Sequence, residues 1–182
     1  MNDTTMITDP YIFIQDNMLS EYRCNEIIKK FEDDKENHYQ GSTGAGIDLS
    51  IKNSKDLQVS QHPHWAEEDK IFHDVVAKGH IDYYNHLNHP QVNDFYQFTD
   101  PTKRHVYKPL HDDDLELLDT GFQIQRTDPG KGYVWHDDSR LDKELLRYLT
   151  FILYLNSVEE GWTQFYNGDQ VSPVAGRLVF FP

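Results

Sequence analysis

Apolar residues recur at helical spacing in two places in the first half of the chain. Between Ser20 and Phe31 they fall at positions i, i+3, i+4 and i+7, so the pattern predicts a helix that Ser20 caps and that ends near Phe31. A second helix is predicted over His64–Leu87, although Gly79 weakens its middle because glycine is a poor helix former. A short strand, Tyr11–Gln15, is predicted before the first helix.

The segments around these helices carry weaker patterns. Gly41–Gly46 lacks the lysine and the following helix of a phosphate-binding loop, so we expect a flexible connection there. Asp48–Val59 is predicted to be a strand that enters a sheet, whereas residues 94–118 mix aromatic, polar and proline residues without predicting an element. The single cysteine, Cys24, lies on the apolar side of the first helix and is predicted to be a buried structural thiol.

After residue 119 the pattern changes to short strands separated by turns. Gly121–Arg126 alternates apolar and polar residues, and Arg147–Leu155 and Leu178–Phe181 are further predicted strands. Asn167-Gly168 lies between two apolar runs and is a strong hairpin signal. Several short strands with tight turns indicate an all-β barrel or sandwich, with the preceding helices packed outside it.

The strand Arg147–Leu155 has two different faces. One face is wholly apolar and consists of Leu149, Phe151, Leu153 and Leu155, while the other consists of Tyr148, Thr150, Ile152 and Tyr154. A face that mixes hydroxyl groups with an aliphatic group suits the wall of a small-molecule pocket. It also suits the wet outer face of an amphipathic strand, and periodicity alone does not decide between these interpretations.

Charge and composition restrict the possible functions. The 182 residues suit one domain, and the formal charge of −14 argues against nucleic acid and anionic membranes as partners. No apolar run is long enough to span a membrane, and Met1–Pro10 lacks a signal-peptide profile. One cysteine cannot form an internal disulfide, so a cytoplasmic location is expected.

His136 and Asp138 are the strongest candidates for chemistry. On a strand, side chains at positions i and i+2 share a face, so an imidazole nitrogen and a carboxylate oxygen can meet at one point. They would be two of the three ligands of a 2-His-1-carboxylate triad, which suits Fe(II) and oxygen chemistry. Asp137 would point away from the metal. The alternative interpretation is an ordinary surface loop.

Similar patterns elsewhere in the chain are weaker. His111 and Asp113 have the same spacing but lie in an acidic run without a strand pattern, so a solvated loop is predicted there. His73-Asp74 lies in the second predicted helix, where adjacent side chains diverge. The chain has no Gly-x-Ser-x-Gly motif, no paired cysteines for zinc and no dinucleotide-binding fingerprint.

Four segments share their order and spacing with one known family. They are Gly130–Ser139, Arg147–Asn156, Gly161–Phe165 and Pro173–Pro182. In these segments the chain resembles the Fe(II)- and 2-oxoglutarate-dependent dioxygenases of the prolyl 4-hydroxylase type, from Asp119 to Pro182. Together they are far more specific than the His-x-Asp triplet alone. Lys52–Asp56 is a weaker match, to the helical lead-in of microbial and viral members.

The resemblance implies a fold class of α+β, mainly β. The implied architecture is a double-stranded β-helix (a jelly roll, cupin-like) with supporting N-terminal helices and its last strands missing. Residues 1–182 would form a single oxygenase-like domain. Within it, residues 1–118 would be a helical lead-in with early strands, and residues 119–182 an incomplete β-helix core.

The resemblance also implies cofactors and roles for individual residues. Fe(II) and 2-oxoglutarate, with ascorbate as a further candidate, would serve hydroxylation of a peptidyl proline or a similar C–H bond. His136 and Asp138 would be the first two iron ligands. Tyr154 matches a tyrosine that hydrogen-bonds the far carboxylate of 2-oxoglutarate in some relatives. Thr150 and Tyr148 are further candidate cofactor-binding residues on the same strand face.

One departure from the family pattern concerns the third ligand. In the family, the segment that Gly176–Pro182 matches is followed by a distal histidine and a basic residue, and no histidine follows His136 here. We therefore expect a C-terminally truncated member with weak Fe(II) binding, little turnover and unpaired barrel edges that favour homo-oligomers. The less favoured alternative is that an earlier histidine completes the triad: His62, His64, His105 or His111.

A non-enzymatic function is the competing hypothesis. A jelly-roll binding or structural module that has lost its metal site would keep the same strands and turns. The expected partner of an enzyme is a peptide or small-molecule substrate, and the sequence does not identify which one.

Overall fold

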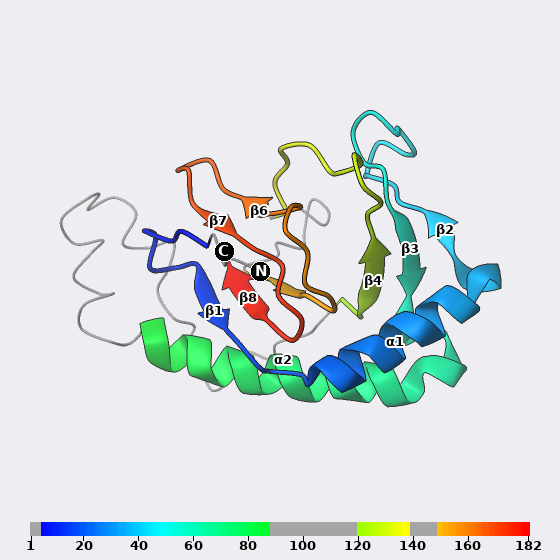
Figure 1. Ribbon diagram of the computed structural model, residues 1–182, viewed down its shortest axis with the longest axis horizontal. Coiled ribbons are helices and arrows are strands. Elements are labelled where there is room, and N and C mark those ends of the chain that lie inside the picture. The colour runs from blue at the N-terminus through cyan, green and yellow to red at the C-terminus, as the bar shows by residue number, and fades with distance from the viewer. Residues whose placement is uncertain (1–4, 88–119, 139–148) are drawn as a thin grey trace.

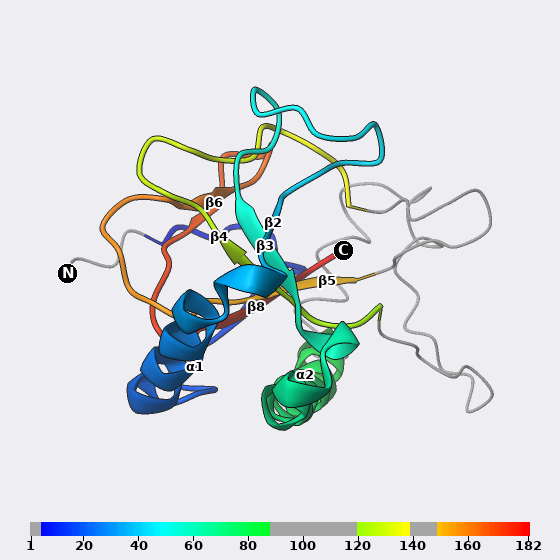
Figure 2. The same ribbon diagram turned by 90° about the vertical axis from the view of Figure 1, so that its right-hand side faces the viewer.

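The computed structural model describes residues 5–87, 120–138 and 149–182, and these combine helices with antiparallel sheets. Two long helices, α1 (Glu21–Asp33) and α2 (Ala66–Leu87), lie on one side of the strands (Figures 1 and 2). This arrangement confirms the predicted combination of N-terminal helices with a strand-rich second half.

The remaining elements are short. The strands are β1 (Phe13–Gln15), β2 (Tyr39–Gln40), β3 (Lys55–Gln58), β4 (Gln123–Arg126), β5 (Thr150–Leu153), β6 (Thr163–Gln164), β7 (Gln170–Val171) and β8 (Leu178–Phe181). Three single-turn 3₁₀ helices cover Lys35–Asn37, Val59–Gln61 and Pro63–Trp65.

The strands form three antiparallel sheets among the described residues. Their orders are β1-β8-β5, β2-β3-β4 and β6-β7. In the first sheet the central strand β8 pairs on both sides, with Phe180 opposite Phe13 in β1 and Phe151 in β5. The β6–β7 sheet is the hairpin that Asn167-Gly168 predicted, and Gly168 has the positive φ of 92° that such a turn favours.

The two helices begin and end close to where the sequence predicted. Ser20 caps α1, since its hydroxyl accepts a hydrogen bond from the backbone N–H of Arg23. Gly79 does not interrupt α2. A Cβ at Gly79 would lie 2.4 Å from Leu178 Cδ2 and 2.8 Å from Phe180 Cε2, so glycine lets β8 approach the helix closely. Gly79 was expected to weaken the helix, but the close packing of β8 against α2 requires a glycine at this position.

Strand β8 separates two apolar clusters. Leu178 and Phe180 are buried against α2 together with Tyr83, whose ring stacks on that of Phe180 at 5.6 Å. Val179 faces the other way and packs with Val171 of β7. A third cluster joins the helices to β3 and β4, and consists of Ile27, Phe31, Leu57, Val59, Trp65, Phe72, Phe122 and Ile124.

The two faces of the predicted Arg147–Leu155 strand, which contains β5, have different surroundings. Its apolar face packs against the helical side, where Phe151, Leu153 and Leu155 contact the cluster of Ile27 and Trp65. On the other face Tyr154 packs against the cluster of Val171 and Val179, so at Tyr154 this face is covered by other strands and is not a wet outer surface. Cys24 is fully buried, as predicted.

The predicted Asp48–Val59 strand is shorter than expected. Residues 48–51 form a turn instead of the beginning of a strand, because Asp48 accepts hydrogen bonds from Ser50 and from the backbone N–H of Ile51 and Lys52. Only Lys55–Gln58 of the predicted Asp48–Val59 strand is a strand, and Val59 begins a 3₁₀ turn. Residues 94–118, for which no element was predicted, and the beginning of the predicted Arg147–Leu155 strand at Tyr148 lie outside the described residues.

The N-terminal segment is tied to the β6–β7 hairpin. The carboxylate of Asp169 accepts hydrogen bonds from the backbone N–H and hydroxyl of Thr8 and from the backbone N–H of Asp9. Met6 and Gln170 exchange backbone hydrogen bonds of 2.9 Å. These contacts join residues 6–9 to residues 169–170, which are far apart in the sequence.

Within the described ranges, none of the helices combines the length and apolar character that crossing a lipid bilayer requires.

Gly176 offers a stability test of the turn before β8. Its φ is 79°, and a Cβ would lie 2.0 Å from the backbone oxygen of Leu19. We expect Gly176→Ala to lower the free energy of unfolding by about 2–3 kcal/mol, because strain and a backbone clash add together. Gly44→Ala is the control, since a Cβ there meets nothing within 4 Å. Equal urea midpoints for the two variants would contradict this account.

Asp34 provides a pH test of the contact between α1 and the segment before α2. Burial alone would raise its pKa, but hydrogen bonds from Trp65, His64 and Asn37 outweigh burial and lower the pKa from 3.8 to about 2. The ionised form therefore stabilises the fold above about pH 4, and this contribution is lost as the pH falls toward 2. In Asp34→Asn we expect the free energy of unfolding to decrease less steeply than in the wild-type protein as the pH falls over this range. An unchanged slope in urea titrations would refute the assignment.

Candidate metal centre

His136 and Asp138 lie in an extended segment that follows a short ladder with residues 51–53. The backbone N–H of Val134 donates to Ile51, and that of Asn53 donates to Gly132, at 3.0 and 2.9 Å. The ladder fixes Tyr133 opposite Lys52. This bridge is isolated from the sheets, and the two candidate ligands lie a few residues beyond it.

The two side chains converge on one another. His136 Nε2 lies 3.5 Å from Asp138 Oδ1, and about a third of each side chain is exposed (33% and 32%). This separation exceeds a good hydrogen bond. Two ligand atoms that bind the same divalent ion at about 2.1 Å lie roughly 3.0–3.4 Å apart, and the observed separation is close to this value.

The other nitrogen of His136 is held by the backbone. His136 Nδ1 donates to the carbonyl oxygen of Val134 at 2.7 Å, so in the neutral ring the lone pair is on Nε2, the nitrogen that faces Asp138. Metal-binding histidines typically have their second nitrogen bound to a carbonyl or carboxylate in this way. The donor set therefore fits a divalent cation. No third histidine, cysteine or acidic residue joins it within residues 5–87, 120–138 and 149–182.

Tyr133 lies against the candidate ligands. Its ring stacks on the imidazole of His136 with centroids 3.4 Å apart and planes 12° from parallel. Burial, and to a lesser extent the carboxylate of Asp138, raise the pKa of the Tyr133 phenol, so the hydroxyl stays protonated at neutral pH. Sequence reasoning named the segment that contains Tyr133 but gave the tyrosine no role.

Lys52 and Asp56 form a buried ion pair behind this tyrosine. Lys52 Nζ lies 2.9 Å from Asp56 Oδ2, and the two residues are 5% and 0% exposed. The ammonium group also lies 5.4 Å from the centroid of the Tyr133 ring. The only sequence signal was the weak match of Lys52–Asp56 to the family lead-in, which said nothing of burial.

The predicted cofactor-binding residues lie on β5 or beside it. The hydroxyl of Tyr154 is hydrogen-bonded to Thr163 Oγ1 at 2.6 Å, and burial raises the pKa of its phenol. Thr150 begins β5 opposite Phe181 of β8 and is partly buried. Tyr148 lies outside the described residues.

The earlier histidines that could have completed the triad have other neighbours where the structure describes them. His64 Nε2 lies 2.8 Å from Asp34 Oδ2, at the end of α1. The ring of His62 lies 5.5 Å from that of His64. His105 and His111 lie outside the described residues.

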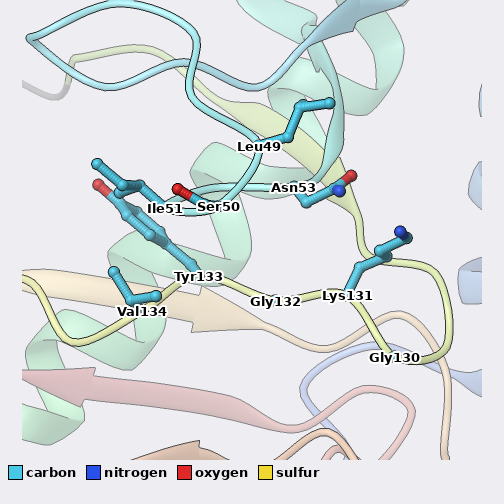
Figure 3. A pocket seen from close by; sticks show the side chains of 9 residues that line it. All are labelled: Leu49, Ser50, Ile51, Asn53, Gly130, Lys131, Gly132, Tyr133 and Val134. Carbon is cyan, nitrogen blue, oxygen red and sulfur yellow. The ribbon is translucent and has the colours of Figure 1, made fainter.

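A hollow of about 310 Å³ lies between residues 49–53 and residues 130–134 (Figure 3). Leu49, Ile51, Tyr133 and Val134 give it an apolar side. His136 and Asp138 do not line it, but it adjoins the candidate ligands through Tyr133 and Val134, both of which contact His136.

An exposed aromatic pair lies next to His136 in the chain. The rings of Trp135 and Tyr166 stack with centroids 4.6 Å apart, although the residues are 53% and 80% exposed. Stacked rings of this kind at the surface are suited to binding flat or cyclic groups.

Comparison with known proteins gives one family match. Residues 122–182 match the family model of the 2OG-Fe(II) oxygenase superfamily. The match covers about a third of the chain, from β4 to β8, and includes both candidate ligands. It supports an oxygenase domain of this superfamily, for which Fe(II) and 2-oxoglutarate are the general cofactors. No curated protein and no solved structure gave a significant match.

Tyr154 and Thr163 allow a test of whether the tyrosine is structural. We expect Tyr154→Phe and Thr163→Val each to lower the unfolding free energy by about 1 kcal/mol, because each breaks the same buried hydrogen bond. The double variant should lose clearly less than the sum of the single losses, as measured by urea denaturation. If Tyr154→Phe is as stable as the wild-type protein, this hydrogen bond is not needed for the fold, and the Tyr154 hydroxyl of the wild-type protein would be available for a ligand.

Proposed function

We propose that this chain is an Fe(II)- and 2-oxoglutarate-dependent oxygenase of the prolyl 4-hydroxylase type that uses His136 and Asp138 as two of its metal ligands. The observation that carries the proposal is the convergence of His136 Nε2 and Asp138 Oδ1 at 3.5 Å within a segment that matches the superfamily model. The three antiparallel sheets would then be parts of a jelly roll.

Each residue near the candidate centre would have a distinct task. His136 and Asp138 would hold the metal, and the carbonyl of Val134 would keep the imidazole in the tautomer that presents Nε2. Tyr154 and Thr150 are the candidates for binding 2-oxoglutarate from β5. Bound Fe(II), with 2-oxoglutarate and O2, would supply hydroxylation of an unactivated C–H bond.

The surface beside the centre supports a peptidyl proline as the substrate. Trp135, the residue before His136, presents a ring that stacks on Tyr166, and proline-rich segments dock on aromatic surfaces. The net charge of −14 would favour a peptide without an acidic surplus.

A non-catalytic module is the second candidate. The observation that favours it is the two-ligand set: among the described residues, no third protein donor completes the centre. In this case the aromatic pair and the strands would bind a peptide without modifying it.

Metal titration tests the proposal directly. We expect the 182-residue polypeptide to bind Co(II), a spectroscopic substitute for Fe(II), and His136→Ala and Asp138→Ala each to weaken binding at least ~10-fold because a ligand is lost. Visible absorption of the bound cobalt measures this binding. Little succinate formation from 2-oxoglutarate is expected, since no histidine follows His136 in the sequence.

A second His–Asp pair provides the control. These adjacent side chains were expected to diverge, but His73 Nδ1 lies 3.7 Å from Asp74 Oδ1 on the exposed side of α2, so the pair resembles the candidate pair in chemistry and separation. His73→Ala should leave Co(II) affinity unchanged. Wild-type affinity in His136→Ala would rule out the proposed centre and favour the non-catalytic module.

A further inference from the structure

We infer that the buried Lys52–Asp56 pair is a positioning element for the candidate metal centre, and that it acts through the ring of Tyr133 on His136. The inference rests on the proposed function for its metal. It adds a part of the site, located on a different segment of the chain, that sets the orientation of the first ligand.

The pair is enclosed by protein on several sides. Asp56 Oδ2 accepts hydrogen bonds from Lys52 Nζ at 2.9 Å and from Gln123 Nε2 at 3.1 Å. The end of β2 also packs against the pair: a Cβ at Gly41 would lie 3.0 Å from Asp56 Oδ2 and 3.0 Å from Lys52 Cε. The ammonium group therefore has a fixed position.

Contacts lead from this fixed group to the ligand. Lys52 Nζ lies 5.4 Å from the centroid of the Tyr133 ring, within the range of a cation–π interaction. The same ring stacks on His136 at 3.4 Å. A ring that is drawn toward a fixed charge can hold a neighbouring imidazole in one orientation, which is what a metal ligand requires.

The backbone reinforces the side-chain contacts. Lys52 is paired with Tyr133 in the ladder, and the carbonyl of Val134, the next residue, accepts from His136 Nδ1. The Tyr133 ring thus contacts one face of the imidazole, and the Val134 carbonyl contacts one edge of it. Tyr133 and Val134 both belong to the segment that pairs with residues 51–53.

Stability alone gives little reason for a buried ion pair here. Desolvation of two charges offsets much of their attraction, and apolar replacements of similar volume are often tolerated. Among the described residues Asp56 Oδ1 also finds no hydrogen-bond partner although it is buried, so within this part of the chain the pair is incompletely compensated. A role in orienting Tyr133 explains why a charge is present at this position.

The test measures the orientation of His136 without requiring metal. A ring stacked at 3.4 Å shifts the Cε1 proton of the imidazole upfield in an NMR spectrum, and His136→Ala identifies this resonance. We expect the shift to be lost in Tyr133→Leu, kept in Tyr133→Phe, and reduced by at least half in the double variant Lys52→Met/Asp56→Leu. Co(II) affinity should fall about 10-fold in the double variant while its melting temperature changes little.

A matched pair elsewhere serves as the control. Lys30 forms an ion pair with Glu68, and its Nζ lies 4.7 Å from the ring centroid of Trp65. Lys30→Met/Glu68→Leu removes the same kind of contact and should change neither the His136 resonance nor Co(II) affinity. Asp56→Asn is the milder variant if the double variant does not fold, and we expect an intermediate shift.

The outcomes separate this inference from the proposed function. An unchanged His136 resonance in both Lys52→Met/Asp56→Leu and Asp56→Asn, in folded protein, would overturn the inference even if cobalt binds. Absence of Co(II) binding in the wild-type protein would overturn the proposed function, and the NMR shift would still decide whether the pair orients His136.

Discussion

The pairing of residues 51–53 with residues 132–134 is the constraint on which the candidate site depends. It places Tyr133 beside Lys52 and turns the carbonyl of Val134 toward the imidazole of His136. Because the ladder ends there, the next residues are free of sheet hydrogen bonding and their side chains can converge. A regular strand would have kept His136 and Asp138 on one face, but further apart than 3.5 Å.

Strand β8 connects the part of the chain that matches an oxygenase superfamily with the helical part that precedes it. Phe180 packs on α2 and Val179 packs on β7, so one strand contributes to both apolar clusters. Gly79 permits the close contact between α2 and β8. The helices therefore support the same sheet whose other face receives Tyr154.

Local signals predicted much of this arrangement. The cap at Ser20, the hairpin at Asn167-Gly168 and the strand Leu178–Phe181 each depend on residues close in sequence, and each was found where expected. His136 and Asp138 were expected to share a face of a strand, but residues 135–138 form no strand, so their role as metal ligands stays a prediction. The Lys52–Tyr133 contact was not predicted, because it joins segments far apart in sequence and a lysine pattern does not reveal burial. The turn at Asp48 was missed because its side-chain hydrogen bonds compete with strand formation.

The tie between Asp169 and the N-terminal segment has a consequence for biosynthesis. Thr8 and Asp9 find their partner only after the β6–β7 hairpin has left the ribosome. Strand β1 likewise can pair only after β8 has been made. Contacts of such long sequence separation slow folding, so β1 would remain unpaired until β8 has been made.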